Sequence, residues 1–392
     1  MNYQIVGSGR AGALVVRPRE ASFGHQIVEI AMGLHLGRHL GRPVCFRRPT
    51  KTTNAALFEI ECEEVSVLHG WRAWGVGLLA RRAERRTLSR LEAQRTAATQ
   101  AGRKFKPGPP DLHGMDFRDC YAHVPLTVRL RPSVMATARA AAVRLGLAPD
   151  ARIVTVHARE SGFKALEGGD GPADALRNAR IETYLPACDL LVARGYTVVR
   201  IGDPAMTPFD HPGVIDLATS VHRTEALEVY CLLQAVLQIA GDSGPYCATY
   251  ISRAPCLAVN VTNVVGGYPL RSHDRYLLKR VRDTGTGRAL ALREMVETDY
   301  FEHRKDLSRY AYTDNTPEEI LDAVSEMLEL LEDGRAPVPE QRVFRDLVDE
   351  LYQSPAVSSR RVRKGEPAVQ VLGDGFIGRA FVERCLDSSS VD

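Results

Sequence analysis

Residues 236–245 read VLQIAGDSGP, an apolar run of strand length that passes into small residues and a proline. Two other apolar runs end in polar loops in the same way, at 152–158 (RIVTVHA) and at 196–201 (YTVVRI). Helical patterns at 181–194 and 224–235 separate these runs. Strands that alternate with helices predict an α/β fold whose parallel sheet is covered on both faces. The same half is predicted to hold further elements: a strand at 213–217, a helix at 245–253, a strand at 255–261 and a helix at 316–332.

The first third of the chain repeats this alternation on a smaller scale. Residues 13–17 favour a strand, and the apolar spacing over 25–40 is close to the helical period. Strands are predicted again at 44–46 and 65–68. Gly146 to Asp150 then form a natural domain boundary. We therefore predict three parts: a domain over 1–148, a second domain over 149–335 and a C-terminal tail over 336–392.

Composition excludes several classes of protein. The 392 residues include 51 Lys or Arg and 48 Asp or Glu, and the formal charge of +3 argues against an overall polycationic nucleic-acid binder. No apolar window reaches the roughly 18 residues of a membrane span, and no secretory signal is apparent. The eight cysteines form no C-x-x-C pair and no zinc spacing, which is typical of reduced thiols in a cytoplasmic protein.

Residues 72–106 differ from the rest because they hold ten Arg or Lys against two acids, Glu84 and Glu92. A thin apolar stripe runs through them, formed by Leu78, Leu79, Leu88 and Leu91. Two interpretations stay open for this insertion in the first domain. It is a basic helix that faces an anionic membrane surface or ligand, or it is an ordinary helix with a solvated basic face.

Two stretches have the G-x-G-x-x-G spacing of a dinucleotide fingerprint. Gly7 to Gly12 precedes a strand-like run, where the fingerprint needs a helix. Only 14 residues follow the second stretch, Gly373 to Gly378, whereas a βαβ unit needs about 30. We expect neither stretch to bind NAD.

Three predicted strand ends carry the residues for a ligand site. The carboxyl ends of parallel strands meet at one edge of a sheet, where open α/β sheets bind ligands. The loop Asp242-Ser243-Gly244 lets an anion approach the backbone, and Ser243 adds a hydroxyl donor. This pattern predicts a phosphate site. The alternative is a tight strand-to-helix turn with an aspartate cap. The third strand end supplies Arg200, Gly202 and Asp203.

The loop after the strand at 152–158 contributes charged side chains. Arg159 is placed for a bidentate phosphate contact, and Glu160 either orients Arg159 or meets a sugar hydroxyl. His157 is expected to point away as a structural residue. Arg177 precedes the next helix and is a further candidate. Each arginine taken alone is also compatible with an ordinary surface ion pair.

His25 opens the first predicted helix, in the sequence Ser22-Phe23-Gly24-His25. A histidine at that position is suited to act as a general base at neutral pH. The alternative is a structural role at the helix start.

Several motifs occur in a fixed order: VTVHARES (154–161), RNARIETY (177–184), VVRIGD (198–203), GDSG (241–244) and a Pro255-to-Asn260 spacing. In this order they resemble a family of bacterial glycosyltransferases from cell-surface-glycan and natural-product gene clusters. The DSGP turn is similar to that of lipopolysaccharide heptosyltransferases, and the H-x-R turn to that of GDP-fucose-dependent fucosyltransferases. The resemblance implies a GT-B fold: two Rossmann-like domains that face across a cleft, with a C-terminal tail that crosses back.

The resemblance also implies roles for individual residues. Four residues would hold the donor diphosphate: Arg159, Arg200, Ser243 and Gly244. Arg177 and Glu160 would approach the donor, and Asn260 would support the loop. Lys164 corresponds to a phosphate-side lysine, although an acidic glycine-rich insertion at 167–174 interrupts the match. His25 matches the position where many of these enzymes place their base, whereas the heptosyltransferases have an acid there.

We therefore expect a cytoplasmic glycosyltransferase that moves a sugar from a nucleotide-diphosphate donor to a hydroxyl or amine acceptor. The resemblance implies catalysis without an essential metal or cofactor, and inversion at the sugar carbon. A GDP- or ADP-linked donor is favoured, with a glycan, lipid-linked or small-molecule acceptor and no nucleic acid. Two alternatives stay open: a nucleotide-sugar epimerase or hydrolase, and a sugar-nucleotide-binding protein without turnover.

Overall fold

The computed structural model describes most of the chain. The described residues are 2–6, 12–18, 22–80, 93, 96–97, 100, 112–161, 175–262, 271–355, 357 and 374–387. Lys164 and the insertion at 167–174 lie outside them, as does most of the basic stretch after Ala80.

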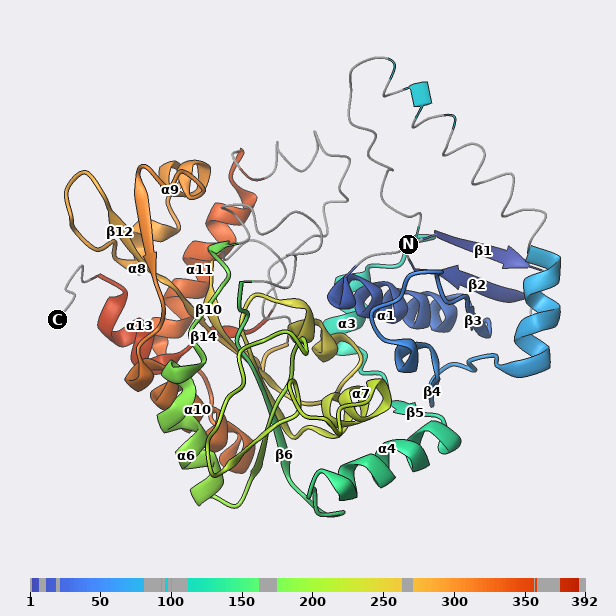
Figure 1. Ribbon diagram of the computed structural model, residues 1–392. Coiled ribbons are helices and arrows are strands. Elements are labelled where there is room, and N and C mark those ends of the chain that lie inside the picture. The colour runs from blue at the N-terminus through green and yellow to red at the C-terminus, as the bar shows by residue number, and fades with distance from the viewer. Residues whose placement is uncertain are drawn as a thin grey trace.

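A seven-stranded sheet, parallel at every pairing, forms the centre of the molecule (Figure 1). Its strands in spatial order are β14 (Phe376–Ile377), β11 (Arg275–Leu278), β10 (Cys256–Val261), β9 (Leu237–Ala240), β6 (Ile153–His157), β7 (Thr197–Arg200) and β8 (Val214–Asp216). After β6, the strands β7 and β8 are added on one side of it. The chain then crosses to the other side of β6, where β9, β10, β11 and β14 follow in order. This doubly wound order places a topological switch point between β6 and β9. The predicted α/β class is confirmed.

Helices cover both faces of this sheet. One face packs against α6 (Leu185–Ala193), α10 (Pro317–Asp333), α11 (Pro339–Gln353) and α13 (Arg379–Cys385). The other face packs against α7 (Glu225–Gln234) and the 3₁₀ helix η5 (Gly244–Tyr250). A 3₁₀ turn, η4 (Ile181–Tyr184), leads into α6. The predicted helix at 316–332 is confirmed as α10.

Local signals set the bounds of α10. The Thr316 hydroxyl accepts from the Glu319 amide, and the Glu319 carboxylate accepts from the Thr316 amide, which completes a capping box. The helix ends at Gly334, whose φ of 63° is left-handed and suits a residue without a side chain.

Antiparallel β12 (Arg280–Asp283) and β13 (Tyr310–Thr313) flank this sheet with α8 (Leu292–Met295) and α9 (Thr298–His303). The sequence patterns did not predict these four elements. In the described part of the tail, β14 extends the central sheet beside β11, and α13 packs on α10. Asp374 also lies 3.4 Å from His123 of the N-terminal half. None of the described helices is both long enough and apolar enough to cross a membrane.

The N-terminal half contains a smaller, mixed sheet. β1 (Asn2–Val6) is antiparallel to β2 (Ala13–Arg17), which is parallel to β3 (Val44–Phe46). The strand predicted at 65–68 is reduced to a single bridge between Val67 and Val44. Helix α1 (Phe23–His39) packs on this sheet, and residues 70–80 form a further helix at its other face.

Neither glycine fingerprint has the structure that a dinucleotide requires. The first lies between two antiparallel strands, β1 and β2, so no helix follows it. In the second, Phe376 and Ile377 form strand β14 inside the motif itself. The elements described around these two stretches therefore differ from the strand–loop–helix order of a dinucleotide fingerprint, and the absence of NAD binding stays a prediction.

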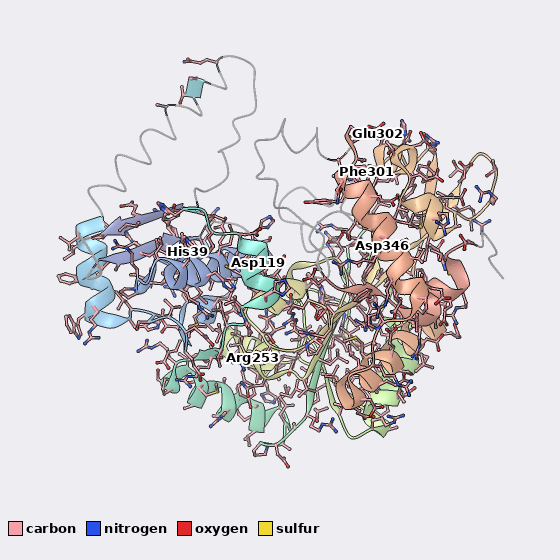
Figure 2. All side chains as sticks on the ribbon, turned by 180° about the vertical axis from the view of Figure 1, so that it is seen from behind. His39, Asp119, Arg253, Phe301, Glu302 and Asp346 are labelled. Atoms are coloured by element: carbon pink, nitrogen blue, oxygen red, sulfur yellow. The ribbon has the colours of Figure 1, made fainter. Side chains whose placement is uncertain are left out.

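The two halves meet along α7 and η5. Helix α4 (Pro132–Arg144) packs on α7, and the short elements η2 (Ala55–Phe58), β4 (Ile60–Cys62) and β5 (Val128–Leu130) lie beside it. Helix α3 (Phe117–His123) stacks its Phe117 ring on Tyr250 at a centroid distance of 6.1 Å. Arg253, labelled in Figure 2, ion-pairs with Glu64 across the same junction. One continuous cluster of buried apolar side chains includes residues of both halves.

We predict that acid destabilises the fold through two buried histidines. Burial is the main cause that lowers the pKa of His35 and of His157 to about 4, from 6.5 in an unfolded chain. Between these values the unfolded chain binds two protons that the folded chain does not. The free energy of unfolding should therefore fall as pH drops from 6.5 towards 4, by about 1.4 kcal/mol per pH unit for each histidine.

Urea unfolding over this pH range tests the prediction. A His35→Leu variant should lose about half of the slope, whereas replacement of the exposed His222 by alanine should leave it unchanged. If the free energy of unfolding changed equally with pH in the wild type and in His35→Leu, His35 would not contribute to the acid sensitivity.

Candidate functional site at the switch point

The loops that follow β6 and β9 lie side by side at the switch point. His157, the last residue of β6, is paired in register with Ala240, the last residue of β9. The Gly241 amide donates to the His157 carbonyl at 3.1 Å, which continues the pairing for one more residue. The structure therefore brings together the two motifs that the sequence singled out, the loop at 158–161 and the loop at 241–244.

His157 itself takes no part in the site. It is buried, and its Nδ1 lies 2.8 Å from the carbonyl oxygen of Ile201. The neutral imidazole at neutral pH fits a donor to that carbonyl. The predicted structural role of His157 is confirmed.

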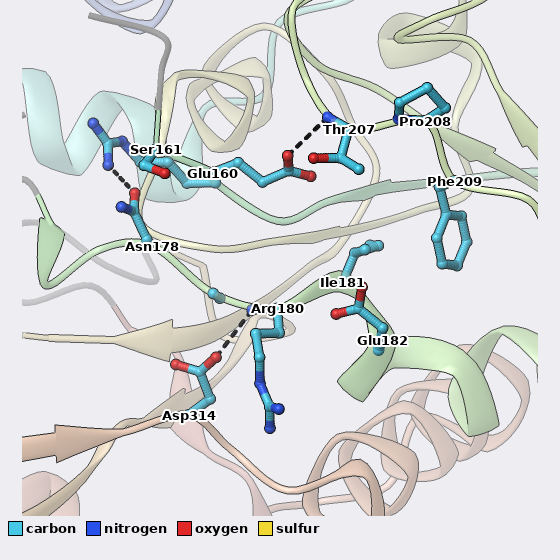
Figure 3. Close-up of a pocket in the computed structure, with 12 residues that line it drawn as sticks. Glu160, Ser161, Asn178, Arg180, Ile181, Glu182, Thr207, Pro208, Phe209 and Asp314 are labelled. Atoms are coloured by element: carbon cyan, nitrogen blue, oxygen red, sulfur yellow. Dashed lines mark hydrogen bonds between the residues drawn. The ribbon is translucent and has the colours of Figure 1, made fainter. Parts of the chain in front are cut away.

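A cavity of about 410 Å³ opens beside the loop after β6 (Figure 3). Arg159 lines it and donates a hydrogen bond to the side-chain oxygen of Asn178. The Ala179 amide donates to the Arg159 carbonyl at 2.9 Å, which fixes the segment 178–182 against this loop. The apolar wall of the cavity is formed by Ile181, Pro208 and Phe209.

Arg200 does not lie in the site. Its side chain is 0% exposed and ion-pairs with Glu160 at 2.5 Å and with Asp216 at 3.0 Å. Its guanidinium also donates to the Thr207 carbonyl at 2.8 Å. A diphosphate cannot reach this group without breaking the ion pairs. The expected phosphate contact of Arg200 is therefore corrected to a positioning role.

Glu160 is held by that arginine. Its second carboxylate oxygen accepts from the Thr207 amide at 2.9 Å, as the dashed line in Figure 3 shows. The sequence left two roles open for Glu160, orienting Arg159 or meeting a sugar hydroxyl. Its carboxylate accepts from Arg200 and from Thr207, and Glu160 also lines the cavity.

Gly202 and Asp203 shape the turn after β7 and do not face the cavity. A side-chain carbon at Gly202 would lie 2.2 Å from the sulfur of Met206, so the flexible Met206 side chain packs directly against this glycine. The Asp203 carboxylate accepts from the Ala205 amide at 2.9 Å within the same turn. Neither residue lines the cavity, and their donor-binding role stays a prediction.

The turn after β9 differs from the predicted strand-to-α-helix turn. In place of an α-helix at 245–253, the chain forms the seven-residue 3₁₀ helix η5. The Asp242 carboxylate accepts from the Thr262 hydroxyl at 3.2 Å, and its carbonyl lies 3.5 Å from a guanidinium nitrogen of Arg177. The Ser243 hydroxyl makes no capping bond to η5. Arg177 thus reaches the turn from the segment that borders the cavity.

Asn260 is the penultimate residue of β10. Its φ of 57° is left-handed, and asparagine is among the few residues that tolerate this conformation. Its side-chain oxygen accepts from the Asn315 amide, and the Asn315 oxygen accepts from the Asn260 amide, both at 2.7 Å. Asn260 is fully buried, so it positions backbone and offers no contact to a ligand.

The start of α1 abuts the turn after β9. A side-chain carbon at Gly24 would lie 2.9 Å from both the Gly244 Cα and the Cys247 sulfur. The neighbouring His25 is exposed, and its Nδ1 lies 2.8 Å from the Ser22 hydroxyl. The first turn of α1, in the N-terminal half, therefore contacts the Ser243-Gly244 turn, in the second half of the chain.

We predict that Gly24→Ala destabilises the protein by about 1–3 kcal/mol, because the new methyl group must displace backbone at Gly244. The matched control is Gly75→Ala in the helix at 70–80, where nothing lies within 4 Å of the new carbon. That variant should be neutral or stabilised, by up to about 1 kcal/mol. Equal melting temperatures for the two variants would contradict the close approach.

Sequence reasoning missed a group of residues at the far side of the cavity. The Lys279 ammonium is buried and lies 2.6 Å from the Asp314 carboxylate and 2.7 Å from the Asn178 carbonyl. The other oxygen of Asp314 accepts from the Arg180 amide at 2.9 Å. Arg180 is exposed and lines the cavity, so it is a third positively charged side chain beside Arg159 and Arg177. The RNAR motif was the available signal for Arg180, whereas Lys279 directly precedes β12 and Asp314 directly follows β13, two strands that the patterns did not predict.

Comparison with known proteins identifies no family. No family model and no curated protein matches the chain. Among solved structures, the chain is similar to a glycosyl transferase family 9 protein from Veillonella parvula DSM 2008, with a TM-score of 0.44 and 13% identity. The match covers 80% of this chain and 96% of that one. A likeness of this size does not identify an activity.

Proposed function

We propose that the protein is a glycosyltransferase of GT-B type that uses a nucleotide-diphosphate sugar. One observation carries the proposal: a cavity lined by Arg159 and Arg180 opens beside the loop after β6, that loop runs beside the turn after β9 at the switch point of the sheet, and the first turn of α1 with His25 packs on that turn. Donor-binding groups and a candidate base thus come from the two halves of the chain.

The site has parts that suit each portion of such a donor. The cavity volume lies within the usual range for small-molecule sites, and Phe209 and Ile181 offer an apolar wall to a nucleoside. Carboxylates and carbonyls at its rim accept from a base or ribose. The arginines Arg159, Arg177 and Arg180 supply positive charge for a diphosphate.

The chemistry that we propose is a one-step displacement. The acceptor oxygen or nitrogen forms a bond to the sugar C1 while the bond from C1 to the diphosphate oxygen breaks, and His25 takes the acceptor proton. Negative charge develops on the leaving diphosphate, where fixed cationic donors stabilise the transition state more than the ground state. Because these donors are side chains of the protein, we propose that transfer needs no metal.

Thermal shift with GDP, ADP, UDP, dTDP and CDP, each with and without EDTA, tests the donor site. A ligand at a hundred times its dissociation constant adds about 2.7 kcal/mol of stability. We expect one diphosphate, GDP or ADP in first place, to raise the melting temperature with no effect of EDTA. No shift with any nucleotide would overturn the proposal. Donor turnover without an acceptor would instead identify an epimerase or hydrolase, and binding without turnover a sugar-nucleotide-binding protein.

Arg159→Ala should lower turnover by about a hundredfold, because loss of one charged donor to the leaving group costs on the order of 3 kcal/mol. The nucleotide-dependent thermal shift should shrink with it. Arg159→Lys keeps the charge but loses the planar guanidinium that reaches Asn178. Its turnover should lie between those of the wild type and Arg159→Ala. Arg144→Ala, on exposed surface of α4, is the matched control. Near-normal turnover in a folded Arg159→Ala protein would exclude the assigned role.

A further inference from the structure

The helix at 70–80 is apolar on two opposite faces. Its inner face carries Ala73, Val76 and Ala80, which pack with Val15 and Cys45 of the small sheet. The Cys45 thiol also donates to the Ala73 carbonyl at 3.8 Å. These contacts hold the helix against the sheet and fix which of its faces is turned outward.

The outer face exposes large apolar side chains. Trp71 is 78% exposed and Trp74 is 65% exposed, and these are the two tryptophans of the entire chain. Leu78 continues the same face at helical spacing, and Leu79 beside it is also exposed. Exposed tryptophans gathered on one face are unusual on a protein that has no partner there, since large apolar patches mark interaction surfaces. We call these four residues the tryptophan face.

The charge of the sequence that contains and follows this helix favours one occupant of the face. Arg72 lies on the helix, with its guanidinium 5.4 Å from the Trp71 ring centre. In sequence, residues 72–106 carry eight net positive charges, whereas the whole chain carries only +3, so the remainder is net acidic. A second copy of the chain would bring two such basic stretches together. An anionic lipid surface instead attracts them.

We infer that the tryptophan face seats the protein on an anionic lipid surface. Tryptophan prefers the boundary between headgroups and acyl chains, where its ring is half apolar and its N–H finds acceptors. A helix with tryptophan and leucine on one face and basic residues around it lies in that boundary without crossing it. The inference is independent of the proposed function, since no residue of the candidate site takes part.

The test uses the intrinsic fluorescence of Trp71 and Trp74, which are the only tryptophan probes in the chain. Vesicles of phosphatidylcholine with one third of the lipid replaced by phosphatidylglycerol should shift the emission to the blue, and brominated acyl chains should quench it. Vesicles of phosphatidylcholine alone should have at least tenfold less effect, and high salt should reverse the binding.

Variants separate this face from other surfaces. Flotation of Trp71→Ala/Trp74→Ala with the anionic vesicles should fall at least tenfold, with an unchanged melting temperature because both side chains are exposed. Val221→Ala, at a 93% exposed apolar residue, is the matched control and should float like wild type. Unshifted emission with anionic vesicles would overturn the inference, and so would undiminished flotation of the double variant. Blue emission that depends on protein concentration without lipid would overturn it in favour of a second copy.

Discussion

Replacement of His25 by alanine is expected to lower sugar transfer by two to four orders of magnitude, the usual contribution of a general base. The imidazole is exposed in the first turn of α1, and the Ser22 hydroxyl lies 2.8 Å from its Nδ1, which helps to orient the ring for taking the proton of the sugar acceptor. Nucleotide binding should persist, because His25 belongs to the opposite half from the arginines. Steady-state transfer and nucleotide thermal shift, measured on the same preparations, separate the two effects.

Two controls sharpen this result. Ser22→Ala removes the partner that orients the imidazole, and should reduce transfer much less than His25→Ala does. His222→Ala removes an exposed histidine elsewhere and should have no effect. Loss of both transfer and nucleotide binding in His25→Ala would show a structural histidine. Retained sugar transfer in His25→Ala would show that another group acts as the base.

Arg200→Met is expected to destabilise the fold by about 3–5 kcal/mol, the effect of removing one member of a buried ion pair. Methionine approximates the length of the side chain but leaves the carboxylates of Glu160 and Asp216 without their cation. Both carboxylates are largely buried, so water replaces the arginine poorly. The free energy of unfolding from urea denaturation measures this loss.

The matched control is Arg129→Met. Arg129 also pairs with two carboxylates, Glu61 at 3.5 Å and Glu63 at 3.1 Å, but all three groups are exposed. Its replacement should cost less than about 1 kcal/mol. A triple variant that combines Arg200→Met with Glu160→Gln and Asp216→Asn should recover part of the loss, because no charge is then left unpaired. Equal effects of Arg200→Met and Arg129→Met would contradict the buried network.

The sequence was sufficient to predict five strands of the central sheet, β6 to β10, but it predicted neither β11 nor β14. Apolar runs such as 152–158 and 255–261 are long, and helical patterns separate them, so periodicity alone predicts a parallel sheet. The meeting of the loops after β6 and β9 then follows from strand order. The tail strand β14 has two residues, and β12 and β13 are rich in arginine and tyrosine. Patterns that short or that polar carry no periodic signal.

The individual site residues were harder to predict. Arg159 follows one parallel strand and Arg200 ends another, and the family resemblance implies the same role for both. The structure separates them because Asp216 of the next strand and Glu160 of the previous loop enclose Arg200. Such partners are distant in the chain, so no local pattern reveals them. Distant contacts matter at η5 as well. The local sequence predicted an α-helix there, but the structure has a 3₁₀ helix that packs against α1.

The apolar cluster that includes residues of both halves has a consequence for how the molecule loses its structure. Leu14 and Ile27 belong to the same cluster as Val199 and Leu227, so neither half has a complete interior by itself. The boundary near residue 148 divides the path of the chain but not its packing. Heating should therefore disrupt both halves in a single cooperative transition. A fragment cut at that boundary would expose the apolar surfaces of α4 and α7 and would be prone to aggregation.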